Sequence, residues 1–385
     1  MNKANDVKSI NLSAILQTIY KNPSITKGRI AAELNLTIVT VNNLVAELCE
    51  IGICEESGFV SNGGRKATLY RINSNYGYII SLSLTRNGIV GAIYDFSLTP
   101  VQEEHIPCDI ADVMDSIRQI QAYLHLQIAN MNDKRVLGIG ISVPGRTSED
   151  GSIISIPDFP QWNSVQLKAI LSENISVPIY LENDTNALLL SAKWNGLAGD
   201  CQSIVYLTTD DGVGAAFMLG NNVFHGSNNQ ACEIGHITID PSGPLCTCGN
   251  SGCLQAYVSN HEILRRINNL REIPVSNIDN AIELYNSGDY AIQSGFHDAT
   301  GYICLAIRNI IMLFDPELII LQNKWLNRLP KLFELVQNMV FKEKKDRSGL
   351  PVRKNLTVLL NNDRHIIDAA SACIVFHNIM QHFTV

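Results

Sequence analysis

Residues 231–253 read ACEIGHITIDPSGPLCTCGNSGC, a stretch in which one histidine precedes three closely spaced cysteines. One imidazole and three thiolates form a complete tetrahedral ligand set for Zn²⁺. Two glycines in the second half allow the tight loop that such a set requires. Because the protein supplies all four ligands, we expect a structural zinc rather than an ion with an open coordination position. The candidate ligands are His236, Cys246, Cys248 and Cys253.

Polar side chains that suit a hydroxylated ligand occur on both sides of this motif. Asn183 and Asp184 directly follow an apolar strand, and Glu233 lies one helical turn before His236. Ligands of open α/β sheets bind at the carboxyl ends of the strands. Asp184 is therefore a candidate general base for a hydroxyl. Taken alone, Asp184 is better explained as a solvated loop acid or a helix N-cap, but together with the zinc loop the functional role is favoured.

The chain from residue 76 onward has an α/β pattern that occurs twice. Residues 78–96 and 203–219 both read as apolar strand, turn and apolar strand, and helical and strand segments follow each pair. This repeat predicts two halves, each starting with a β-hairpin, with a cleft between them.

The first 75 residues have the pattern of a winged helix-turn-helix. They carry eight basic and six acidic side chains, whereas the whole chain has a net charge of −8. Helices are expected over residues 10–20, 26–35 and 38–52, with Thr26 and Thr37 as N-caps, followed by a wing of two strands over residues 53–56 and 67–73. The residues expected to contact DNA are Thr37, Thr40, Asn42, Asn43, Arg65 and Lys66. A helical hairpin used only for packing is the alternative.

Bulk composition narrows the class of protein further. The negative charge argues against non-specific nucleic-acid binding by the whole molecule. The start of the chain does not resemble a signal peptide, and no apolar run reaches the length of a membrane span, so a cytoplasmic protein without a membrane partner is expected. Three of the ten cysteines are bunched in one motif, which favours metal binding over a disulfide framework.

Together these motifs resemble the ROK family (repressors, open reading frames and sugar kinases) over essentially the whole chain. The resemblance rests on the segments GGRKA, GIGISVPG, LENDTNA, CEIGH, CTCGNSGC and DPELIIL. It implies a winged helix-turn-helix over residues 1–74 and a two-lobed actin/hexokinase-like (ribonuclease H-like, duplicated) domain over 75–385. The lobes would span about 75–184 plus the C-terminal helix, and 185–364. The winged helix indicates the repressor branch of the family.

The family's three glycine-rich ATP stretches are altered here. By resemblance they correspond to Ser83–Asn87, Asp210–Gly212 and Gln322–Asn323. Side chains on such turns obstruct the approach of phosphate to the backbone, and aspartates add charge repulsion. Ser83 also cannot replace a carboxylate that organises magnesium. We therefore expect no kinase activity, with Asp184 as a vestigial base.

The sugar side of the family site is better preserved. The resemblance assigns hydroxyl contacts to Asn183, Asp184, Glu233 and His236. Gln255 stands where the family has Glu, Asp158 where Asn is usual, and Cys232 where Gly is usual. These changes leave the identity of the ligand open.

The leading hypothesis is a repressor of carbohydrate-metabolism genes that acts as a homodimer or homotetramer. Its partners would be a double-stranded DNA operator and a small-molecule sugar effector. Three alternatives remain: an ATP-dependent sugar kinase with an attached DNA-binding module, a zinc-sensing regulator, and a regulator controlled by a protein partner.

Overall fold

The computed structural model describes residues 3–61, 66–341 and 356–383. The chain forms two compact units, one of residues 1–194 with 368–385 and one of residues 195–367. The winged helix and the first lobe both belong to the first unit, and the second lobe is the second unit. Within the described ranges, no helix has the length and apolar character needed to cross a membrane.

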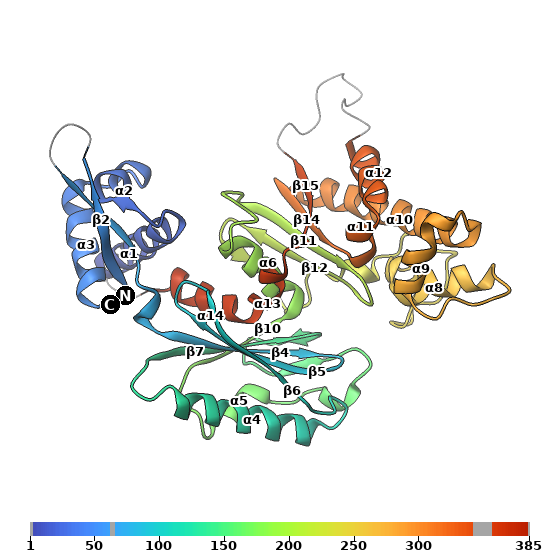
Figure 1. Ribbon diagram of the computed structural model, residues 1–385, viewed down its shortest axis with the longest axis horizontal. Coiled ribbons are helices and arrows are strands. Elements are labelled where there is room, and N and C mark those ends of the chain that lie inside the picture. The colour runs from blue at the N-terminus through green and yellow to red at the C-terminus, as the bar shows by residue number, and fades with distance from the viewer. Residues whose placement is uncertain (1–2, 62–65, 342–355, 384–385) are drawn as a thin grey trace. The chain divides into compact units, whose positions relative to one another are not determined.

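The winged helix begins the first unit (Figure 1). Its elements are α1 (Lys3–Lys21), β1 (Ile25–Thr26), α2 (Lys27–Glu33), α3 (Ile38–Glu50), β2 (Cys54–Val60) and β3 (Ala67–Ile72). Thr26 and Thr37 cap α2 and α3 through their side-chain oxygens, as the sequence predicted. Strand β1 was not predicted; it pairs with β3 and completes a small sheet.

The wing departs from the expected strand boundary. Strand β2 continues to Val60 instead of ending at Glu56, because an irregularity between Glu56 and Gly58 lets the pairing with β3 resume. Gly58 has a φ of 143°, which favours glycine. The wing-tip candidate Arg65 lies outside the described residues, whereas Lys66 is described and exposed.

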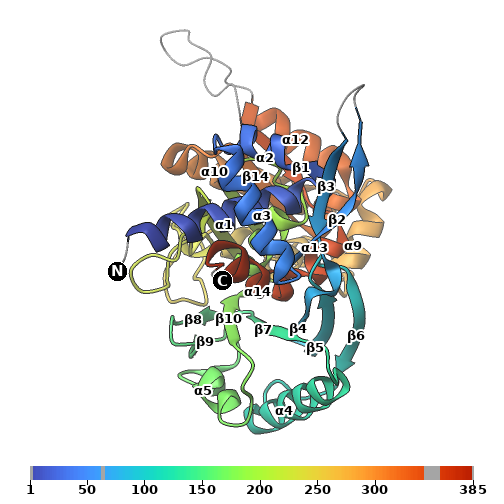
Figure 2. The ribbon, with the colours of Figure 1, turned by 90° about the vertical axis from the view of Figure 1, so that its left-hand side faces the viewer.

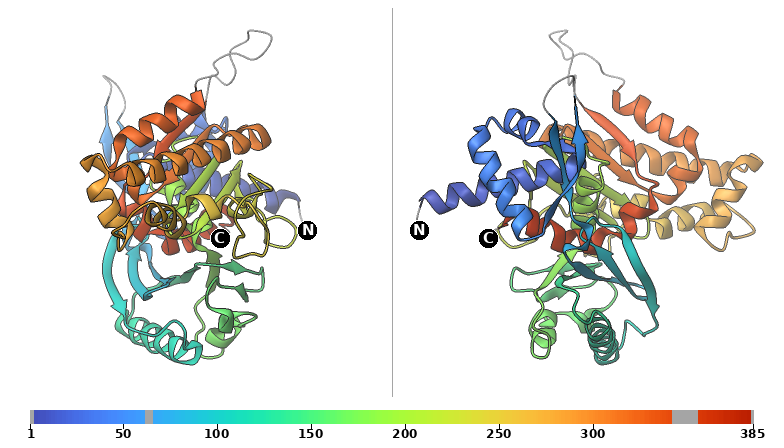
Figure 3. Two further views of the ribbon diagram at one scale, coloured as in Figure 1. Left: turned by 90° about the vertical axis from the view of Figure 1, so that its right-hand side faces the viewer. Right: turned by 60° about the vertical axis from the view of Figure 1, so that its left-hand side comes forward.

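A five-stranded sheet with the order β10-β7-β4-β5-β6 forms the first lobe. The strands are β4 (Tyr78–Thr85), β5 (Gly88–Asp95), β6 (Pro100–Ile106), β7 (Val136–Val143) and β10 (Ile179–Asn183). The other elements are η1 (Ser74–Tyr76), α4 (Val113–Asn130), β8 (Arg146–Thr147), β9 (Ile153–Ser155), η2 (Pro160–Trp162), α5 (Leu167–Ser172), α6 (Asp184–Trp194) and α14 (Ala370–Gln381). Helices α14 and α6 lie on one side of the sheet, and α4 and α5 lie on the other (Figures 1 and 3).

The second unit repeats this topology. Its sheet has the order β13-β12-β11-β14-β15, in which an antiparallel group of three strands is extended by two parallel strands, as in the first lobe. The strands are β11 (Ser203–Thr209), β12 (Val213–Leu219), β13 (Asn222–Val223), β14 (Leu318–Gln322) and β15 (Thr357–Leu360). The helices are η3 (Ile234–His236), α7 (Gln255–Val258), α8 (Asn260–Asn269), α9 (Ile278–Leu284), η4 (Tyr285–Ser287), α10 (Tyr290–Phe314), α11 (Lys324–Arg328), α12 (Pro330–Phe341) and α13 (Arg364–Asp368), whose last residue belongs to the first unit. The predicted duplicated α/β fold is confirmed.

Alternating apolar side chains of neighbouring strands build each core. Ile80 and Leu82 of β4 face Ile139 and Ile141 of β7 in register, and all four side chains are inaccessible to solvent. Gly140 lies between the two β7 residues, and a Cβ there would come within 2.0 Å of the Ser371 carbonyl oxygen. A larger residue would therefore push α14 off the sheet.

Helix α1 of the winged helix packs against α14 of the first lobe (Figure 2). The Ser9 hydroxyl donates to the Phe383 carbonyl at 3.1 Å, the Ser13 hydroxyl to that of Gln381 at 3.3 Å, and the Gln17 amide to that of Met380 at 2.9 Å. The last carbonyls of a helix lack partners within it. Ser13 and Gln17 therefore satisfy the last two carbonyls of α14, and Ser9, four residues earlier in α1, bonds to Phe383 just after the helix.

Candidate functional site

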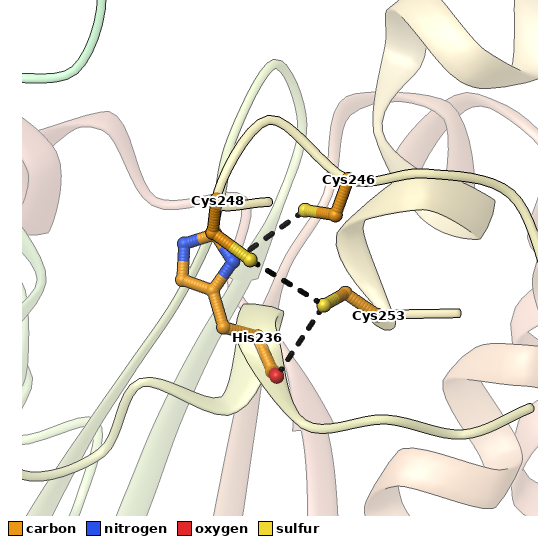
Figure 4. A group of neighbouring side chains, drawn as sticks. All are labelled: His236, Cys246, Cys248 and Cys253. Atoms are coloured by element: carbon orange, nitrogen blue, oxygen red, sulfur yellow. Dashed lines mark hydrogen bonds between the residues drawn. The ribbon is translucent and has the colours of Figure 1, made fainter. Parts of the chain in front are cut away.

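The four predicted metal ligands come together in the second unit (Figure 4). Their ligand atoms all lie within 4.8 Å of one another. The Cys246 Sγ is 3.6 Å from His236 Nδ1, and the Cys248 Sγ is 3.6 Å from the Cys253 Sγ. Zinc bonds of about 2.3 Å to sulfur and about 2.0 Å to nitrogen give tetrahedral S···S and S···N separations of about 3.8 and 3.5 Å. The cluster could therefore hold a metal ion such as zinc.

Backbone hydrogen bonds shape the loop that carries these ligands. The Cys246 amide donates to the Asn250 carbonyl at 2.7 Å, and the Gly249 amide donates to the Cys246 carbonyl at 2.9 Å. Gly252 has a φ of 70°, and a Cβ there would lie 1.6 Å from the Asp240 carbonyl oxygen. The expectation that glycine is needed in this loop is thus confirmed at Gly252.

Asn183 and Asp184 lie at the end of β10, where α6 begins. The Asn183 side chain donates to the Gly145 carbonyl at 2.9 Å and accepts from the amides of Thr185 and Asn186 at 2.9 and 3.2 Å. It therefore links the GIGISVPG and LENDTNA segments and caps α6. Desolvation raises the pKa of Asp184 to about 6, and hydrogen bonds from Thr185 only partly oppose this shift.

Arg86 approaches these residues, and the sequence reasoning did not assign it a role. Its guanidinium forms a 2.7 Å ion pair with Asp158, and its charge acts to lower the pKa of Asp184. Asp158 has a left-handed φ of 68°, which Asp and Asn adopt more readily than other non-glycine residues. The sequence feature that could have drawn attention to Arg86 is a cationic residue at a position where, by resemblance, the family kinases have glycine.

The remaining polyol candidates lie in the second unit. Glu233 immediately precedes the short helix η3, which ends at His236, so the predicted helical turn exists as a 3₁₀ turn. Gln255 begins α7, two residues after the last metal ligand. Cys232 has a left-handed φ of 70°, the conformation that a glycine would adopt without strain. That these residues share one pocket with Asn183, Asp184 and Asp158 stays a prediction.

The serine at the first altered ATP stretch belongs to a chain of hydroxyls. The Ser83 and Ser371 hydroxyl oxygens are 2.7 Å apart, and the Ser371 hydroxyl donates to the Ser142 hydroxyl at 2.7 Å. Ser142 and Ser371 are buried. The three serine hydroxyls thus bond to one another. By resemblance, Ser83 stands where the family kinases have the carboxylate that organises magnesium.

The LTTDDG turn in the second unit is held by its own side chains. The Asp210 carboxylate accepts from the Lys324 amide at 2.9 Å, and the Asp211 carboxylate accepts from the Asn260 side chain at 3.0 Å. Asn323 is inaccessible to solvent, and its side chain donates to the Thr209 carbonyl at 2.6 Å. Burial raises the pKa of Asp210, and the bond from the Lys324 amide opposes this.

The candidate DNA-contact residues of α3 lie at its start. Thr37, Asn42 and Asn43 are exposed and Thr40 is partly exposed, although the Thr37 hydroxyl is already bonded to Thr40 at 2.8 Å. Ile38 and Val39 are also exposed, at 48% and 64%. These two residues were not among the predicted DNA contacts, yet exposed apolar side chains at the start of such a helix can contact thymine methyl groups.

Comparisons with known proteins now identify the family. The ROK family model matches residues 79–356, and a model described as a winged helix-turn-helix DNA-binding module matches residues 9–53. The chain belongs to the ROK family.

Three known proteins illustrate the relationship. The chain is 30% identical to a putative xylose repressor from Caldicellulosiruptor sp. (strain Rt8B.4), over 83% of this chain and 84% of that one. It is 25% identical to the Escherichia coli K12 DNA-binding transcriptional dual regulator NagC, over 90% and 88%. A solved ROK family transcriptional regulator, a homologue of the E. coli MLC protein, superimposes with a TM-score of 0.81 at 21% identity and covers 98% of this chain and 97% of its own. This ROK protein therefore shares its fold, winged helix included, with that solved structure over nearly the whole of both chains.

Proposed function

We propose that this ROK protein is a sequence-specific transcriptional repressor of carbohydrate-metabolism genes, and that a sugar or sugar derivative bound by its two lobes controls it. The observation that carries the proposal is the winged helix with an exposed recognition helix, continuous with a ROK domain in one chain. Relatives that match over more than four fifths of both chains are named putative xylose repressor and DNA-binding transcriptional dual regulator NagC.

Several hydrogen bonds argue against phosphoryl transfer from ATP. The Asp210 carboxylate already accepts from the backbone amide of Lys324, so a phosphate oxygen could not use that donor. The buried Asn323 side chain ties the end of β14 to Thr209, where the family kinases have glycine. Two carboxylates beside this turn would also repel a triphosphate by about 1 kcal/mol or more for each charge pair. We therefore infer that sugar binding has been retained without catalysis.

A continuous set of contacts in the first unit provides a route from the sugar residues to the winged helix. Helix α6 begins at Asp184 and ends at Trp194, whose indole nitrogen donates to His377 of α14 at 3.2 Å. The Trp194 ring meets the Tyr20 ring of α1 edge-on, with centroids 5.9 Å apart. A ligand that shifts the start of α6 would thereby bias the position of α1. Such control requires that the ligand bind the two states with different affinity.

The metal centre is proposed to be structural. A zinc ion held by His236, Cys246, Cys248 and Cys253 would leave no coordination position for a substrate. Binding through Nδ1 of His236 would leave Nε2 as a hydrogen-bonding group for a sugar hydroxyl. The ion would thus hold His236, and Glu233 one turn away, in a defined orientation.

The direct test is an operator-binding assay with the full chain. Gel-shift and footprinting on the promoter regions of the source genome should reveal a palindromic site, because dimeric helix-turn-helix proteins read two half-sites about one DNA turn apart. Asn43→Ala should abolish the footprint, whereas Asn130→Ala, at an exposed position on α4 far from α3 in sequence, should not. The absence of a footprint at low salt on any fragment would refute the proposal.

A second assay decides between repressor and kinase. The full chain is incubated with ATP, magnesium and a panel of pentoses, hexoses and amino sugars in a coupled ADP assay. The proposal predicts that one sugar shifts the melting temperature and weakens the footprint, without turnover. Turnover of that sugar would establish a kinase with an attached DNA-binding module.

A further inference from the structure

The wing carries an exposed aromatic side chain near the end of β2. Phe59 is 65% exposed, and Val60 beside it is 38% exposed. Thr68 and Ala67 pair with these two residues across the hairpin, and neither is large enough to cover an aromatic ring. Single exposed apolar residues are common on protein surfaces, so exposure alone assigns Phe59 no role.

A β-bulge in β2 decides which face of the wing Phe59 occupies. The pairing shifts between Glu56 and Gly58, where β2 has one residue more than β3. Gly58 has a φ of 143°, and a Cβ there would meet nothing within 4 Å, so the backbone conformation rather than packing favours glycine. Because successive strand residues point to opposite faces, the extra residue turns Phe59 to the face opposite the one it would occupy in a regular strand.

The face that Phe59 occupies is the one on which the helices of the module pack. Its partner Thr68 shares this face with Tyr70 and Ile72, both of which are buried. Lys27, the first residue of α2, lies over the Tyr70 ring, with its Nζ 5.1 Å from the ring centroid. Phe59 therefore points to the side of the wing where α2 begins, but beyond the part of the sheet that the helices cover.

DNA is the partner whose surface meets this side of the wing. When α3 occupies the major groove, a wing beside it reaches the adjacent minor groove. That groove is about 6 Å wide, and proteins that bend DNA insert phenylalanine or another apolar side chain between base steps there. Among the described residues of the wing beyond the Phe59–Thr68 pair, Lys66 is charged and none is acidic, which suits a polyanion.

We propose that Phe59 inserts between two base pairs from the minor groove beside each half-site, and that the bound chain thereby bends its operator. This inference rests on the proposed repressor function and adds a deformation of the DNA to it. Each inserted side chain should kink the duplex by about 20–90°. The cost of unstacking depends on the base step and is lowest at pyrimidine–purine steps. The step beside the half-site is therefore recognised through its deformability, without a hydrogen bond to its bases.

The test measures the bend of the operator in its complex with the full chain. A duplex that contains the footprinted operator carries a fluorescent donor at one end and an acceptor at the other. The natural chain should raise the energy transfer, because bending brings the two ends together. Phe59→Ala should reduce the bend by at least about 20° for each half-site, while α3 still protects the operator. Phe59→Leu, which keeps an apolar side chain, should retain most of the bend.

Val60→Ala is the matched control, because Val60 is the adjacent exposed apolar residue on the opposite face of β2. It should leave the bend unchanged. Operators with a TA step beside the half-site should bind the natural chain more tightly than operators with an A-tract there, and Phe59→Ala should lose this preference.

The outcomes separate this inference from the repressor proposal. A protected operator that stays straight, a bend that survives Phe59→Ala, or an equal loss of bend in Val60→Ala overturns the insertion of Phe59 and leaves the repressor proposal standing. The absence of protection on every fragment would overturn both.

Discussion

The three side chains of α1 that bond to the end of α14 and to Phe383 just after it allow a quantitative test of how the winged helix is held. The perturbation is the triple variant Ser9→Ala, Ser13→Ala and Gln17→Ala. Ser13 is buried and Ser9 and Gln17 are partly exposed, but none of the three belongs to the buried apolar set of α1, which comprises Leu12, Ile15, Leu16 and Ile19. The winged helix itself should therefore remain folded, while its docking on the first lobe weakens.

The magnitude follows from the three hydrogen bonds, all of them partly buried. A hydrogen bond contributes about 0.5–1.5 kcal/mol net, so their loss should cost about 3 kcal/mol in total. That corresponds to roughly a 100-fold shift of the docking equilibrium. Aromatic contacts of Tyr20 with Phe376 and Trp194, with centroids 4.7 and 5.9 Å apart, should keep some of the docked state.

Hydrogen exchange followed by mass spectrometry measures this shift peptide by peptide. Peptides from the end of α14 should exchange up to about 100-fold faster in the triple variant, and peptides of the second unit should be unchanged. Lys8→Ala is the control, because Lys8 pairs with Glu47 inside the winged helix at 2.6 Å. Unchanged exchange at the end of α14, or an equal effect of Lys8→Ala, would refute the capping argument.

Further predictions concern the metal, the partly buried carboxyl of Asp184 and the DNA-binding face. Elemental analysis should find one zinc per chain. Cys246→Ser should lose the metal and have a lower melting temperature, because metal binding and folding are coupled. Full metal content in that variant would contradict the predicted ligand set. Because the pKa of Asp184 is raised from 3.8 to about 6, the stability that this group contributes is fully present below pH 3.8 and is lost as the pH rises through about 6. Asp184→Asn should thus be more stable than the natural chain at pH 7.5 but not at pH 3.5 in urea denaturation, and an equal difference at both pH values would exclude the raised pKa. Asn42→Ala should relax base specificity at one operator position. Lys66→Ala should instead lower the affinity for all DNA sequences alike and reduce the salt dependence of binding. The reverse pattern would contradict the assigned contacts.

The sequence by itself determined features that depend on short spacings. The metal ligands could be found because three of them lie within eight residues, and loop glycines such as Gly252 indicated the required turn. The caps Thr26 and Thr37 were predictable because an N-cap bonds only to amides two or three residues ahead. The duplicated α/β pattern could be recognised because strand and helix periods differ in any context.

Only the tertiary structure decided which distant groups meet. Arg86 pairs with Asp158 across 72 positions, Asp210 accepts from Lys324 across 114, and the α1 residues reach α14 across more than 360. No local pattern encodes such contacts, because they follow from the packing of whole helices and sheets. The physical reason is that side-chain pairing across a core is selected by burial and by the need to satisfy polar groups, both of which exist only once the chain has folded.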